Sequence, residues 1–142
     1  LRADQRPAAE HTLLSPLLLA FATRTSRVIL PALTALHRSI VIKTIPDASI
    51  QAVLDALHEL IATQRIDVDA QLKILQIASA LLTAYASVTA ARLSSVLMLC
   101  FYLYENARVT VVTSTAAATL RQNIMTVFFY NFINGIYFVF IY

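Results

Sequence analysis

The sequence predicts an all-α fold, an armadillo- or HEAT-like α-solenoid of antiparallel helices. Apolar residues recur at the three- and four-residue spacing of a helix face in successive segments joined by short turns. The run Leu33–His37 is echoed by Leu54–His58, one helix and turn further on, so helix pairs would repeat at about 40 residues. The one glycine, Gly135, leaves residues 1–134 without phosphate loops, dinucleotide turns or nucleophile elbows. These observations favour a helical binding protein over an enzyme.

The first two predicted helices each contain a proline. The segment Leu13–Ala22 is apolar, and its Ser15–Pro16 pair is typical of a helix start. In Ser26–Ile42, Pro31 lies near the first turn, where a missing N–H costs least, and a bend is expected there.

The third segment, Asp47–Thr63, has an apolar face and a polar face. Pro46 and Asp47 mark its start, because an aspartate there can accept hydrogen bonds from free N–H groups of the first turn. It is therefore predicted to be an amphipathic helix with one face in water.

The next two segments are more apolar and are predicted to lie in the middle of the fold. In Val68–Tyr85 two apolar stripes require neighbours on both sides, and Asp67 and Asp69 suit the positive end of the helix dipole. In Thr89–Tyr104 apolar residues lie nearly all round the helix. Asn106 is expected to end it in a left-handed conformation.

The last predicted helix, Val109–Phe128, begins with a β-branched run that by itself favours a strand. The residues that follow, Ala116–Gln122, are mostly strong helix formers, and no other strand candidate offers a partner. We therefore predict a helix, in which the small residues of Ala116–Ala118 let neighbouring helices approach closely. Ala117 is the expected contact between layers.

Composition narrows the function classes. The chain of 142 residues is 58% apolar and 13% charged, enough for one continuous core. Its basic residues are spread out, which disfavours nucleic-acid binding.

The single cysteine, Cys100, lies in an apolar run and is expected to be buried. A lone cysteine forms no disulfide framework and fits a reducing compartment. Residues 1–12 are interpreted as a polar leader cut from a longer chain, residues 13–128 as the helical-repeat domain and residues 129–142 as a tail.

Several stretches carry a resemblance to a known family: Asp69–Gln76, Leu99–Phe101, Asn106 and above all Thr115–Gln122, which reads TAAATLRQ. Over residues 16–128 the chain resembles the DCB (dimerisation and cyclophilin-binding) domain of the monensin-sensitivity Golgi scaffolds. These large proteins are related to the BIG and Sec7 exchange factors but lack the catalytic Sec7 domain. The related exchange factors resemble the chain more loosely.

The resemblance implies a helical-repeat interaction module and no catalysis. It implies a cytoplasmic scaffold, peripheral on trans-Golgi and endosomal membranes through its partners, that acts in endosome-to-Golgi retrieval and vesicle-mediated protein transport. Implied partners are a Dopey-type scaffold, an Arf-like small GTPase and a second copy of the chain. The alternative within the family is the regulatory DCB domain of a Sec7-type Arf guanine-nucleotide exchange factor.

Candidate partner-binding residues are Tyr102, Tyr104, Arg121 and Gln122. The two tyrosines are one residue apart at a helix end, so they point in different directions, and an exposed tyrosine beside Arg108 would make a binding anchor. Arg121 and Gln122 are candidates for a surface contact or an inter-helix hydrogen bond. No cofactor, metal or catalytic residue is predicted, because the three histidines, at 11, 37 and 58, lack metal-ligand spacing and Asp67 and Asp69 are explained by the helix dipole.

From Asn123 onward the chain carries no charge, and Ile124–Tyr142 is long and apolar enough to be a transmembrane candidate. A small tail-anchored membrane protein is therefore a third hypothesis. Asn131, Asn134 and the absence of flanking basic residues argue against it. The composition also switches abruptly to Phe, Tyr, Ile and Asn where the family's helix stays charged, which favours a translated intron or a faulty gene model.

Overall fold

The computed structural model describes residues 6–63, 65–85 and 88–141, with side chains described from Leu14 to Ile136 apart from the gaps. Six α-helices, one 3₁₀ helix and no strand are found in these ranges. Residues 1–5 of the predicted leader and Tyr142 of the predicted tail lie outside them. In chain order the elements are α1 (Arg6–Ala22), α2 (Ser26–Val41), η2 (Asp47–Ser49), α3 (Ile50–Thr63), α4 (Val68–Ala84), α5 (Ala90–Asn106) and α6 (Thr110–Ile141).

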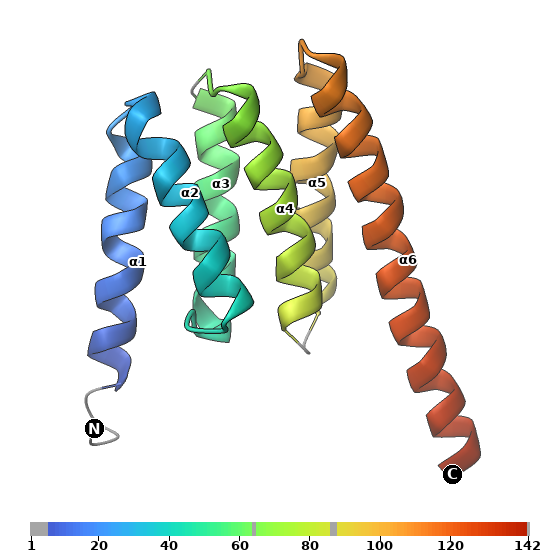
Figure 1. Ribbon diagram of the computed structural model, residues 1–142. Coiled ribbons are helices and arrows are strands. Elements are labelled where there is room, and N and C mark those ends of the chain that lie inside the picture. The colour runs from blue at the N-terminus through green and yellow to red at the C-terminus, as the bar shows by residue number, and fades with distance from the viewer. Residues whose placement is uncertain (1–5, 64, 86–87, 142) are drawn as a thin grey trace.

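The helices form two layers, which confirms the predicted α-solenoid (Figure 1). Helices α1, α3 and α5 lie in one layer, and α2, α4 and α6 lie in the other. Each helix contacts the next one in its own layer, and α1–α2, α4–α5 and α5–α6 also pack across the layers. This arrangement of antiparallel neighbours buries a continuous core between the layers.

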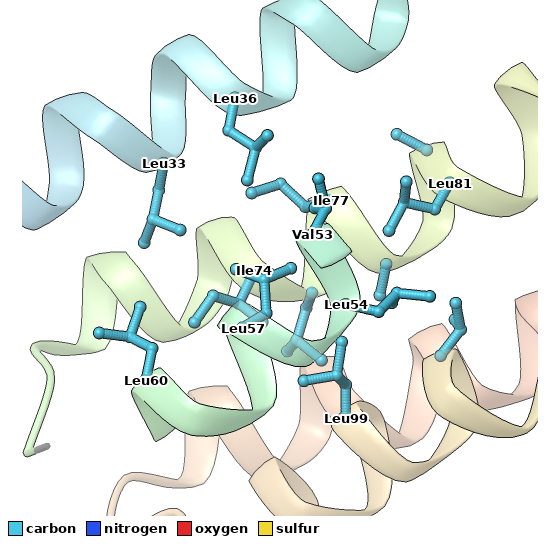
Figure 2. Packing of buried hydrophobic residues seen from close by; sticks show 14 of the residues in the cluster. Leu33, Leu36, Val53, Leu54, Leu57, Leu60, Ile74, Ile77, Leu81 and Leu99 are labelled. Atoms are coloured by element: carbon cyan, nitrogen blue, oxygen red, sulfur yellow. The ribbon is translucent and has the colours of Figure 1, made fainter. Parts of the chain in front are cut away.

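The core lies where α2 and α4 meet α3 and α5 (Figure 2). Leu33 and Leu36 of α2, and Leu54 and Leu57 of α3, are buried and point into it. The sequence echo therefore places equivalent leucines on consecutive helices, one in each layer. Helix α4 is buried on two sides, as its two stripes predict, with Ile74 and seven other residues inside.

Helix α5 is less enclosed than its sequence predicts. It buries Val96, Leu99 and Cys100, but Met98 and Phe101 are about half exposed. The prediction that it lies in the middle of the fold is wrong on this side, because α5 is in the same layer as α3 and nothing in the described chain covers its outer face.

Two helix boundaries lie far from the predicted positions. Helix α1 begins at Arg6, so the start predicted at Leu13 is wrong, and Pro16 lies inside the helix instead of at its first position. The preceding residues include Ala8 and Ala9, which are strong helix formers and extend it backward. Helix α6 continues beyond the predicted end at Phe128 to Ile141.

The residues whose backbone is in the left-handed conformation are basic ones, not the asparagine predicted from the sequence. Asn106, predicted to be left-handed, is the last residue of α5, and Ala107 after it is extended. Positive φ angles among the described non-glycine residues occur at Arg24 (56°) and Lys43 (57°). At the end of α2 the N–H of Lys43 donates to the Ile40 carbonyl and that of Thr44 to the Ser39 carbonyl, a Schellman ending in which lysine replaces glycine.

A buried arginine ties the turn before α3 to the start of α5. The Arg92 side chain is 8% exposed and donates to both carboxylate oxygens of Asp47 at 3.1 Å. It also lies over the ring of Tyr85, whose hydroxyl donates to the Ile45 carbonyl. The hydrogen bonds from Arg92 hold the pKa of the Asp47 carboxyl below its ordinary value. The prediction that Asp47 caps its own helix is therefore wrong, because Arg92 takes its carboxylate.

Packing along α6 changes from its first half to its second. Ala116 is fully buried whereas Ala117 is half-buried and Ala118 exposed, so the close contact predicted for Ala117 belongs to Ala116. Toward its C-terminal end the helix runs past the ends of α4 and α5 (Figure 1). In the part of the chain that the structure describes, no helix is both long and apolar enough to cross a membrane.

Candidate protein-interaction site

An open groove of about 570 Å³ lies at the end of the solenoid where the α3–α4 and α5–α6 connections come together (Figure 1). Its volume falls in the range of ligand-binding pockets. We refer to it as the turn-edge groove. It is lined by residues 61–63, 65–68, 71, 102–103 and 106–109.

Hydrogen bonds anchor described residues at both sides of the turn-edge groove. Ile66 is buried, and its carbonyl accepts a hydrogen bond from Gln71 Nε2 at 3.2 Å. Across the groove, Asn106 Nδ2 donates to the Tyr102 carbonyl at 2.9 Å. The N–H of Ala107 donates to the Leu103 carbonyl at 3.0 Å. The described residues that flank the groove are thus anchored to the packed helices.

The charged and aromatic side chains of the groove are exposed. Tyr102 is 37% exposed, and Arg65, Arg108 and Asp67 are also accessible. In the ranges that the structure describes, neither the Arg65 nor the Arg108 guanidinium forms an ion pair. Arginine and tyrosine dominate the energetics of protein interfaces, and an unpaired guanidinium can bind a carboxylate with two hydrogen bonds. The groove therefore suits a protein segment that carries both a carboxylate and an apolar side chain.

The other three candidate residues lie outside the turn-edge groove. Tyr104 is 45% exposed on α5, and its position two residues from Tyr102 turns it to a different side, as expected. Arg121 and Gln122 are exposed on α6. Arg121 Nε donates to the Ala117 carbonyl of its own helix at 3.4 Å, and among the described residues Arg121 makes no hydrogen bond to another helix. The partner-binding roles of all four residues remain predictions.

On α6 a hydrogen bond to a neighbouring helix is made by a residue that the sequence did not single out. Asn123 is 1% exposed; its Oδ1 accepts from Ser79 Oγ of α4 at 3.1 Å. Its Nδ2 points at Cys100 Sγ of α5 at 3.9 Å. The available signal is spacing, since Asn123 follows Val112, Ala116 and Leu120 on the buried stripe of α6.

No catalytic arrangement is assembled from the titratable residues that the sequence offered. His58 Nε2 lies 2.9 Å from the Ser95 carbonyl, and His37 is half-buried, its pKa lowered by burial and by Lys73. The side chain of His11 lies outside the described residues. Asp67 precedes α4 and Asp69 lies in its first turn, as the dipole argument predicts. Within the described ranges no group of His, Cys, Asp and Glu could hold a metal ion.

Cys100 is fully buried, as predicted, and burial raises the pKa of its thiol to about 11. The thiolate is the reactive form of cysteine, so this side chain is chemically inert at neutral pH.

Comparison with protein families gives a match over most of the chain. A family model described as Mon2/Sec7/BIG1-like, dimerisation and cyclophilin-binding (DCB) domain matches residues 3–130. A comparison with curated proteins finds no match for the chain.

Proposed function

The chain belongs to the DCB family of Mon2/Sec7/BIG1-like proteins, whose domain is a dimerisation and interaction module, and from this premise we propose a specific role. It is the non-catalytic protein-interaction module of a scaffold that acts in endosome-to-Golgi retrieval and vesicle-mediated protein transport. The scaffold is cytoplasmic and peripheral on trans-Golgi and endosomal membranes, which it reaches through its partners. The support for the scaffold branch is the TAAATLRQ run at Thr115–Gln122.

The turn-edge groove is the observation that carries the proposal. It combines an exposed tyrosine, Tyr102, with two guanidiniums, Arg65 and Arg108, on connections held by hydrogen bonds. An ordered groove loses little conformational freedom when a partner binds, so more of the contact energy appears as affinity. We propose that this groove receives an acidic segment of a Dopey-type scaffold or of an Arf-like small GTPase.

Binding by the groove can be tested with a double variant, Tyr102→Ala with Arg108→Glu. We expect it to bind one of the two partners at least tenfold more weakly, because the substitution removes the apolar anchor and reverses a charge facing the partner's carboxylate. The measurement is titration of the immobilised chain with a purified Dopey-type protein and, separately, with GTP-loaded Arf-like GTPase.

Phe101→Ala is the matched control, because this aromatic side chain is exposed on the same helix and lies outside the groove. Its affinity should equal that of the unmodified chain, and the melting temperature of all variants should be unchanged. Equal binding by the double variant and the control would remove the groove from the proposal.

The regulatory DCB domain of a Sec7-type Arf exchange factor is the second candidate, since the description of the matching family names Sec7 and BIG1 beside Mon2. A catalytic Sec7 domain in the full-length gene would favour this candidate, and its absence favours the scaffold. In either case we expect no nucleotide exchange on Arf-type GTPases by the chain itself. Exchange above background with purified protein would contradict the non-catalytic assignment.

A further inference from the structure

A second groove, of about 470 Å³, lies between α1 and α3, which are neighbours in one layer (Figure 1). It runs between residues 18–22 of α1 and residues 52–63 of α3, with Arg24 of the turn after α1 at its border. We call it the α1–α3 groove. Thr63 is the one lining residue that it shares with the turn-edge groove, among the residues that the structure describes. It is therefore a separate surface of the solenoid.

The floor of the α1–α3 groove is apolar. Phe21 and Leu60 are buried, and Leu18 beside them is half-buried. On the α3 side the groove is lined by Ala52 and Ala56, one turn apart, whose small side chains leave the space between the two helices open. Apolar side chains that enter the groove leave water for this floor, which favours binding.

The apolar surface continues from the groove across α1. A shallow hollow of about 320 Å³ on this helix shares Leu18 and Ala22 with the groove. Leu19, which also lines the hollow, is 65% exposed. The groove and the hollow together form an apolar strip that several side chains of one protein segment can cover.

The charged side chains on the α3 side of the groove are carboxylates. Asp55 and Glu59 are exposed and four residues apart, so they lie on one face of α3, about 6 Å apart along its axis. In the part of the chain that the structure describes, neither forms an ion pair. Gln51 Nε2 donates to Asp55 Oδ1 at 3.0 Å and orients that carboxylate. The cation at the border, Arg24, belongs to a turn at the end of the solenoid where α3 also ends (Figure 1).

The charge of the groove selects its occupant. Two carboxylates repel the phosphates of an anionic membrane or of a nucleic acid, and they repel an acidic protein segment. Basic side chains four residues apart match the spacing of the two carboxylates. In a helix, residues three and four apart share a face, so a basic amphipathic helix presents its apolar side chains to the floor at the same time.

We propose that the α1–α3 groove binds a basic amphipathic helix of a partner protein. The helix lies along the groove, with its apolar face on the floor and its basic side chains paired with Asp55 and Glu59. This inference goes beyond the proposed function, because it concerns another surface and a partner segment of the opposite charge. One chain then offers one groove to an acidic segment and another to a basic helix.

The probe for this groove is a synthetic helical peptide of about 16 residues, with leucines along one face and arginines four residues apart beside them. A matched peptide carries glutamate at each arginine position. Fluorescence anisotropy of the labelled peptides, titrated with the full chain, gives the dissociation constants. We expect the arginine peptide to bind at least about tenfold more tightly than the glutamate peptide. Added salt should narrow the difference, because exposed charges are screened.

Two charge variants locate the binding site. Glu59→Lys should weaken binding of the arginine peptide at least about fivefold, because it replaces attraction by repulsion. Glu105→Lys is the matched control, since this exposed carboxylate of α5 lines neither groove, and it should leave the affinity unchanged. Asp55→Lys with Glu59→Lys should reverse the preference and bind the glutamate peptide more tightly than the arginine peptide.

A third variant tests the shape of the groove. Ala52→Leu fills the groove without changing its charge and should weaken binding of the arginine peptide at least about fivefold, because the incoming helix then clashes. All the substituted positions are exposed, so circular dichroism should show an unchanged fold and melting temperature.

Four outcomes would overturn the proposal: no binding of the arginine peptide, equal binding of the two peptides, equal affinities of the Glu59→Lys and Glu105→Lys variants, and full affinity in Ala52→Leu. The last two would place the peptide on another surface. None of these variants changes Tyr102 or Arg108. Titration of the same proteins with a Dopey-type protein or an Arf-like GTPase therefore tests the proposed function separately.

Discussion

The two halves of α6 share one backbone and differ in what covers them. From Thr110 to Asn123 the helix buries small side chains such as Ala116 against α4 and α5, and its outer side carries Arg121 and Gln122. From Ile124 to Ile136 the side chains are large, apolar and mostly exposed. Helical conformation therefore does not indicate burial. Along α6, the small side chain of Ala116 belongs to the core, whereas large aromatic side chains such as Phe128 are exposed.

The largest expected difference between the halves comes from a buried charge. Asn123→Asp keeps the size of the side chain but places a carboxylate at a site that is 1% exposed. We expect a loss of about 3–5 kcal/mol in the free energy of unfolding, because the charge has no compensating cation there. Asn131→Asp, two turns later, should cost at most about 0.5 kcal/mol. Urea denaturation measures both, and equal losses would contradict the comparison.

A smaller effect is expected from added volume. Ala116 is fully buried and Ala118 exposed, two residues apart on the same helix. Ala116→Leu should lower the free energy of unfolding by about 1–3 kcal/mol through overpacking, while Ala118→Leu should change it little. Thermal denaturation followed by circular dichroism provides the measurement. If the Ala116→Leu variant has the same melting temperature as the unmodified chain, the contact between layers is looser than the structure indicates.

The smallest effect is a pH dependence at the Cys100 thiol, beside Asn123. Burial raises the pKa of this thiol from 9.0 to about 11, so the unfolded chain releases its proton more readily than the folded chain. The stabilisation is complete below pH 9 and is lost as pH rises toward about 11. Urea denaturation across this range, compared with Cys100→Ala, isolates the thiol from other titrating groups. If the free energy of unfolding changes with pH in the same way for both proteins, the thiol is not buried as described.

The sequence predicted the helical fold and several helix ends closely, because apolar spacing records the buried face of each helix. For α2 and α4 the predicted ranges, Ser26–Ile42 and Val68–Tyr85, end one residue beyond the observed helices. The β-branched run after Val109 is helical, as the alanines downstream favoured. Local pattern is sufficient where the apolar residues of a helix follow its buried faces.

Long-range contacts were not predictable, since nothing local in the chain records them. Arg92 and Asp47 are far apart in sequence, and neither side chain has a spacing that points to the other. The left-handed residues Arg24 and Lys43 were missed for a related reason: glycine or asparagine is the usual signal, and here the packing of helix pairs imposes the turn. For the site, Tyr102 was singled out beside Arg108, but the groove that joins them to Arg65 depends on how two connections meet.

The origin of residues 129–142 and the division of the chain at residues 12 and 128 stay predictions. The family match ends at residue 130, while α6 continues without a break to Ile141. A mature transcript that encodes the tail in frame would contradict a translated intron.

The Arg92 cluster has a consequence for how the protein folds. A solenoid of neighbouring repeats can unfold one repeat at a time, because each contacts only the next. Here the bond from Arg92 to Asp47 spans 45 residues and that from Tyr85 to Ile45 spans 40. Together they close a long loop that joins the turn before α3 to the end of α4 and the start of α5. The array should therefore unfold in a single transition and refold more slowly than its local helical contacts alone would allow.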